Sequence, residues 1–132
     1  MKHKSLYILV FFVLMFVFSC TKIRESRIEG TWEYIPLTYD ASVDEFWTFT
    51  ENDELIVKRI YNSSITTTHD TGTFHIKAEG LSGYVEVFDI DKYTNGKYRI
   101  KKVTNKQLKI LRILDGEGNS EYVLREFIKS SE

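Results

Sequence analysis

From Gly30 onward, short runs rich in Val, Ile, Thr, Tyr, Phe and Trp alternate with polar turn residues. The turns recur at intervals of roughly a dozen residues, which is typical of strands joined by short connections. No segment in this part of the sequence repeats its apolar residues at the helical period of about 3.6 over three turns. The pattern therefore predicts an all-β domain. Its eight strands are expected at residues 30–35, 44–50, 54–61, 66–77, 83–92, 97–104, 107–114 and 121–128.

Eight strands joined in order can close into an antiparallel up-and-down barrel or divide into a two-sheet sandwich. We favour the barrel, because it leaves no unpaired edge strand, whereas a sandwich must protect its edges. Asn95-Gly96 predicts a two-residue hairpin between the strands at 83–92 and 97–104, since both residues tolerate a positive φ. The longest connection runs from Pro36 to Val43.

The chain begins with a second pattern, an apolar run from Leu6 to Phe18 that follows Lys2 and Lys4. A helix that spans a bilayer needs about 20 apolar residues, and this run is shorter. A charged start, an apolar stretch and small Ser19 are typical of a secretory signal peptide. We therefore expect a signal peptide over residues 1–19, a tether over 20–27 and one folded domain over 28–132.

Val17-Phe18-Ser19-Cys20 resembles the lipobox of bacterial lipoproteins, although Phe18 replaces the usual small residue. The resemblance implies that Cys20 becomes the lipidated first residue of the mature protein and anchors it to a membrane. Thr21, which is not Asp, implies the outer membrane. An ordinary cleaved signal and an uncleaved anchor are the alternatives.

Removal of residues 1–19 takes Lys2 and Lys4 from the 18 basic residues, so 16 remain against 19 acidic ones and the net charge is −3. The basic residues are scattered along the sequence, which argues against a nucleic-acid partner. Cys20 is the only cysteine, so the domain has no disulfide.

The strand sequences themselves carry a second resemblance. Gly30-Thr31-Trp32, Trp47-Thr48-Phe49, Thr71-Gly72-Thr73-Phe74 and the segment 98–108 are together similar to small lipocalin-like domain lipoproteins of Gram-negative bacteria. In that family the first Trp closes the barrel floor beneath a basic side chain from the last strand, a role that would fall to Trp32 and Arg125. The chain lacks the C-terminal helix and the disulfides of typical lipocalins.

Few residues suggest chemistry. His69 and His75 would lie about 20 Å apart on one strand, which is too far to share a metal ion. Asp89-Ile90-Asp91 lacks the calcium ligands that an EF-hand needs at its fifth and sixth positions. The sequence contains no nucleophile motif such as Gly-x-Ser-x-Gly. We therefore expect neither an enzyme nor a bound cofactor or metal.

Two functions remain open. In the first, the barrel binds a small apolar ligand between Trp32, Trp47, Phe49 and Phe74. In the second, these rings fill the barrel, and outward apolar residues such as Leu111 and Ile113 dock the domain on an envelope complex. An eight-stranded barrel is just wide enough either to be filled by side chains or to hold one small ligand.

Overall fold

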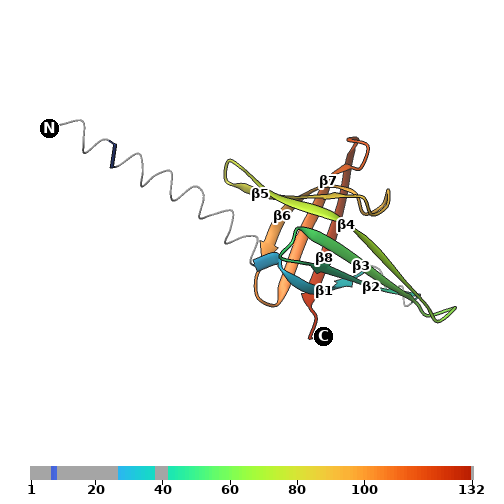
Figure 1. Ribbon diagram of the computed structural model, residues 1–132. Helices are drawn as coiled ribbons and strands as arrows, with labels where there is room; N and C mark the ends of the chain where they lie inside the picture. The colour runs from blue at the N-terminus through green and yellow to red at the C-terminus, as the bar shows by residue number, and fades with distance from the viewer. Residues whose placement is uncertain (1–6, 9–26, 38–41, 132) are drawn as a thin grey trace.

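Eight antiparallel strands, each paired with the next along the chain, form a closed barrel in which β8 pairs back with β1 (Figure 1). The computed structural model describes residues 7–8, 27–37 and 42–131. The strands are β1 (Gly30–Ile35), β2 (Val43–Phe49), β3 (Glu54–Tyr61), β4 (Thr66–Glu79), β5 (Ser82–Phe88), β6 (Gly96–Val103), β7 (Gln107–Asp115) and β8 (Ser120–Lys129). The all-β class and the barrel predicted from the sequence are confirmed.

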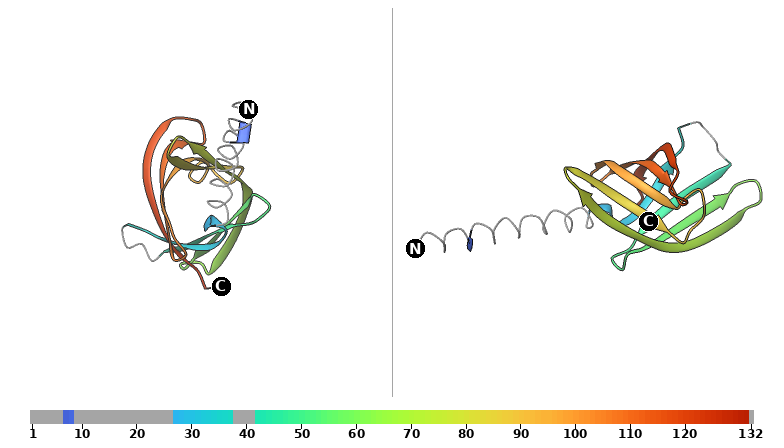
Figure 2. Two further views of the ribbon diagram at one scale, coloured as in Figure 1. Left: turned by 90° about the vertical axis from the view of Figure 1, so that its left-hand side faces the viewer. Right: turned by 90° about the horizontal axis from the view of Figure 1, so that it is seen from above.

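Alternate residues of each strand point into the barrel, because side chains of a strand project to opposite faces in turn. The left view of Figure 2 shows the strands arranged around a common axis. Aromatic and branched apolar side chains fill the interior along this axis. The buried cluster consists of Ile28, Trp32, Trp47, Phe49, Leu55, Val57, Phe74, Val85, Val87, Tyr98, Leu108, Ile110 and Phe127.

The strand order gives the barrel two distinct ends. Arg27–Gly30, the turns β2–β3, β4–β5 and β6–β7, and the end of β8 lie at what we call the N-terminal end. The end of β1, the start of β2 and the turns β3–β4, β5–β6 and β7–β8 lie at the far end. Figure 2 (right) shows the β4–β5 turn and the start of the described domain at one end of the elongated barrel.

The hairpin predicted at Asn95-Gly96 is wrong. Strand β5 ends at Phe88, and residues 89–95 form a longer connection, which we call the β5–β6 loop. Asp91 shapes this loop because its carboxylate accepts hydrogen bonds from the backbone amides of Tyr93 and Thr94, at 2.7 and 2.8 Å. A side chain that satisfies its own neighbours in this way competes with strand pairing.

Candidate functional site

The four aromatic residues expected to line a ligand chamber lie inside the barrel, and the rings of Trp47, Phe49 and Phe74 pack on one another. Trp32 and Trp47 are completely buried, and Phe49 and Phe74 are 1 % and 2 % exposed. The ring of Phe49 meets Phe74 edge-on with centroids 5.0 Å apart, and it lies 6.1 Å from Trp47. These rings therefore fill the central part of the barrel. Their role in ligand binding stays a prediction.

Trp32 lies in the interior at the N-terminal end. Its indole Nε1 donates a hydrogen bond of 2.6 Å to the carbonyl of Ile28. The cation above its ring is Lys129, whose Nζ lies 4.3 Å from the ring centroid, in place of the expected Arg125. The register explains the difference, because β1 and β8 place Lys129 opposite Trp32. Arg125 lies four residues away along β8, or about 13 Å.

Lys129 holds the start of the domain in place. Its ammonium also donates a hydrogen bond to the backbone carbonyl of Glu29. Burial lowers the pKa of Lys129 below its ordinary value. The basic side chain of the last strand that lies over Trp32 is therefore Lys129 and not Arg125.

Arg125 instead belongs to a group of acidic and basic side chains near the far end. Its guanidinium lies 5.3 Å from the ring centroids of both Tyr34 and Trp47. The centre of the group is Glu45, whose carboxylate accepts hydrogen bonds from Trp47 Nε1 at 2.7 Å, Arg59 Nε at 2.7 Å and Arg125 Nη1 at 3.1 Å. The side chains of Glu45 and Arg125 are each only 13 % exposed.

Arg59 connects this centre to the β5–β6 loop. Its Nη1 donates to Asp70 at 3.1 Å, and its Nη2 donates to Asp91 and to the Thr94 hydroxyl, each at 2.9 Å. Burial alone would raise the pKa of Asp91, but hydrogen bonds from the Tyr93 amide and Arg59 outweigh it and hold that pKa below its ordinary value. Asp91 is therefore ionised at neutral pH.

Two further side chains secure the loop across the far end. Arg112, whose side chain is 4 % exposed, donates to the carbonyls of Lys92, Tyr93 and Asn95 at 2.7, 3.0 and 2.8 Å. The hydroxyl of Tyr98 donates to the carbonyl of Thr94 at 2.6 Å, and burial raises the pKa of Tyr98 to about 12. We give the name far-end network to six acidic and basic residues, Glu45, Arg59, Asp70, Asp91, Arg112 and Arg125.

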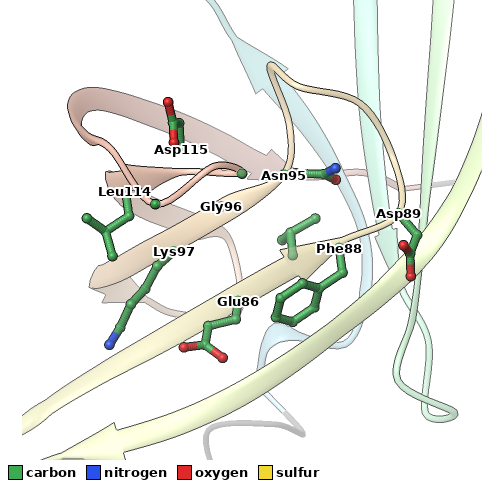
Figure 3. A pocket seen from close by; sticks show the side chains of 11 residues that line it. Glu86, Phe88, Asp89, Asn95, Gly96, Lys97, Leu114 and Asp115 are labelled. Carbon is green, nitrogen blue, oxygen red and sulfur yellow. The ribbon is translucent and has the colours of Figure 1, made fainter.

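Several hollows open on the surface of the described domain. One of about 380 Å³ opens between the end of β5, the start of β6 and the β7–β8 turn (Figure 3). We call it the outer pocket. Phe88 and Leu114 contribute apolar surface to it, while Glu86, Asp89, Asn95, Lys97 and Asp115 contribute polar groups. None of the four expected ligand-lining aromatic residues borders this pocket.

The structure places the two histidines of the domain on its surface. His69 and His75 are both exposed on β4, and His75 packs 5.8 Å from the ring of Phe88. Within the described ranges, no three His, Cys, Asp or Glu side chains lie close enough to hold a metal ion. Cys20 lies outside the described residues. No helix in the described part of the chain is long and apolar enough to cross a membrane.

The sequence reasoning missed Glu45, Arg59 and Arg112, although strand alternation carried a signal for each. Glu45 comes two residues before Trp47, Arg59 two after Val57 and Arg112 two after Ile110. Residues two apart on a strand point to the same face, so a charged residue in such a position beside buried apolar ones has two options. Either the strand is irregular at that point, or the charged side chain lies inside the barrel. The second case needs partners from other strands, because a buried charge is costly unless it is paired.

Comparison with models of protein families, with curated proteins and with solved structures finds no match for this chain.

Proposed function

We propose that the protein is a lipid-anchored lipoprotein of the cell envelope, held through Cys20, whose barrel acts as a non-catalytic interaction module. The packed interior is the observation that carries this proposal. The aromatic rings of the core fill the middle of the barrel, and the far-end network fastens the β5–β6 loop across one end. A barrel filled in this way offers its outer surface to other molecules in preference to its interior.

The outer wall has apolar side chains suited to a protein partner. Leu111 and Leu124 face each other across β7 and β8, and both are partly exposed. Ile35 on β1 and Ile128 on β8 are 43 % and 41 % exposed. These residues lie on three adjacent strands of the barrel wall, β7, β8 and β1. Exposed apolar side chains on a surface favour protein contacts, and Leu111 and Leu124 form a cross-strand apolar pair here.

The outer pocket supports a second function, the binding of a small and partly apolar molecule. Its volume of about 380 Å³ lies within the range of about 300–1,000 Å³ that is usual for ligand sites. Phe88 and Leu114 would contact the apolar part of such a ligand, and the surrounding carboxylates would favour a cationic group. This ligand would bind outside the barrel and not between the core aromatics.

The anchor is tested by metabolic labelling with a clickable fatty acid, followed by membrane fractionation. We expect the wild-type protein to be labelled and sedimented with membranes, and Cys20→Ala to lose the label. Labelling of Cys20→Ala at the wild-type level would refute the anchor. Ser131→Ala, an exposed substitution near the other end of the chain, serves as the control.

The two functions separate in native mass spectrometry of protein extracted from the envelope in mild detergent. On the interaction hypothesis, a partner chain is present and Leu111→Glu removes it, whereas Leu114→Trp leaves it bound. On the ligand hypothesis, a small-molecule mass is present and Leu114→Trp removes it by filling the outer pocket. A bare chain in the wild-type extract would contradict both hypotheses.

A further inference from the structure

Four basic side chains gather at one corner of the N-terminal end. Lys101 and Lys102 lie near the end of β6, and Lys106 lies in the turn that follows it. Arg27 comes just before β1 and lines the same surface hollow as Lys106, so it belongs to this group in space. Figure 1 shows the segment around residue 27 beside the β6–β7 turn. We call this group the basic corner.

The side chains of the basic corner are free to meet an external anion. All four residues are exposed. Across the described ranges, the salt bridges link other residues and leave all four out. The nearest cross-strand neighbour of Lys102 is another lysine, Lys109, whose ammonium is already paired with Glu126 at 2.8 Å. The corner therefore carries uncompensated positive charge.

The opposite side of the same end is acidic. Glu51, Asp53 and Glu54 are all exposed at the β2–β3 turn, and in the strand order this turn lies across the barrel from β6–β7. The β4–β5 hairpin between them is balanced, because Lys77 pairs with Glu86 and Lys97 with Glu79, each at 2.6 Å. The N-terminal end is thus positive on one side and negative on the other.

The proposed anchor brings this end to a membrane. Residues 21–27 can extend only about 20 Å, so an acyl group on Cys20 would hold the N-terminal end near the headgroups. An anionic surface attracts basic side chains within a Debye length of about 8 Å at physiological salt and repels carboxylates. A domain that is polarised across the end facing such a surface has one preferred tilt.

We propose that the basic corner rests on anionic phospholipid headgroups of the membrane that holds the anchor, so that the β6–β7 turn lies close to the membrane and the β2–β3 turn is raised from it. This inference rests on the proposed lipidation of Cys20. It adds a defined orientation of the domain. The outer wall of the barrel, with its exposed apolar side chains, then faces a fixed direction relative to the membrane.

Two exposed asparagines allow a matched test. Asn105 lies in the β6–β7 turn and Asn52 in the β2–β3 turn, both at the N-terminal end. Asn105→Cys and Asn52→Cys are each labelled with an environment-sensitive fluorophore, because an acylated Cys20 leaves the introduced thiol as the only free one. The full lipidated proteins are reconstituted into phosphatidylcholine vesicles with or without phosphatidylglycerol, together with a lipid that carries a quencher on its headgroup.

We expect stronger quenching at position 105 than at 52 in the anionic vesicles, and no such difference in phosphatidylcholine alone. The triple change Lys101→Glu, Lys102→Glu and Lys106→Glu should abolish the difference, since each lysine contributes a factor of about five at an anionic surface. Lys106→Glu alone should reduce it, and it guards against misfolding of the triple variant. Lys92→Glu, which alters an exposed lysine at the far end, should leave the difference unchanged.

The intact mass of each reconstituted protein separates the two proposals. Absence of an acyl mass would overturn the anchor and this orientation together. An acylated protein that is quenched equally at positions 105 and 52, or whose difference persists without phosphatidylglycerol, would overturn the orientation alone.

Discussion

Glu45→Gln tests whether the far-end network stabilises the barrel. The change keeps the shape of the side chain but removes the negative charge between Arg59 and Arg125, and it turns one acceptor into an N–H donor. Removing one partner of a buried ion pair costs about 3–5 kcal/mol. Arg59 retains Asp70 and Asp91 as partners, so we expect a loss at the lower end, about 3 kcal/mol in the free energy of unfolding.

The measurement is urea unfolding in a non-denaturing detergent, followed by tryptophan fluorescence, because Trp47 donates directly to Glu45. For a domain of this size, each kcal/mol corresponds to about 4–8 °C in Tm, so thermal unfolding provides a second reading. Glu126→Gln is the matched control. It removes a carboxylate that pairs with Lys109 at 2.8 Å on the outer wall, where both side chains are about twice as exposed.

An exposed pair of this kind contributes about 0–1 kcal/mol. If Glu45→Gln and Glu126→Gln destabilise the barrel equally, the interior network has no advantage over a surface pair. The view that it fastens the far end would then be wrong.

Three further changes probe other parts of the fold. Trp32→Ala should lower the free energy of unfolding by about 3–5 kcal/mol, since the ring is fully buried, and a loss below about 1 kcal/mol in urea unfolding would show that the ring does not close the N-terminal end. Gly72→Ala would place a Cβ 2.1 Å from the Phe88 carbonyl oxygen, so we expect a Tm lower by the equivalent of about 1–3 kcal/mol, and an unchanged Tm would refute this close approach. Asp91 has a folded-state pKa below its unfolded value, so its stabilisation is present above about pH 4 and is lost as the pH falls through the folded value. Asp91→Asn should flatten the fall in stability below that pH and speed hydrogen exchange in the β5–β6 loop, and an unaltered acid profile would contradict the assignment.

The local pattern of apolar residues and turn residues was sufficient to predict most strands. β1 and β3 have the predicted bounds, β2, β6, β7 and β8 differ by a single residue at one or both ends, and β4 continues two residues further than predicted. This agreement follows from the short connections and from the alternation that each strand needs to bury one face. The exception is β5, which ends at Phe88 and not at Lys92. Contacts of the following loop with Arg59 and Arg112, from distant strands, outweigh the local hairpin preference of Asn95-Gly96.

The contacts of the candidate site were less predictable, because they depend on the register in which the strands pair. The lipocalin-like resemblance required a basic residue of the last strand above Trp32, and both Arg125 and Lys129 share the inward parity of β8. Only the pairing of β1 with β8, which no local sequence pattern fixes, selects Lys129. Glu45 and Arg59 face each other on the neighbouring strands β2 and β3, but their further partners Arg125 and Asp91 come from β8 and the β5–β6 loop, which local pattern does not place beside them.

The pairing of β1 with β8 also has a consequence for how the polypeptide reaches its final form. Lys129 and Glu29, which meet at this seam, are 100 positions apart, and contacts between such distant residues form slowly. Until the ten residues of β8 have been synthesised, β1 and β7 each have a row of backbone amides and carbonyls without hydrogen-bond partners. Such an edge can pair with a neighbouring molecule. Pairing of the final strand removes both open edges and so protects the protein from intermolecular aggregation. A nascent chain would need its edges shielded until that strand has been synthesised.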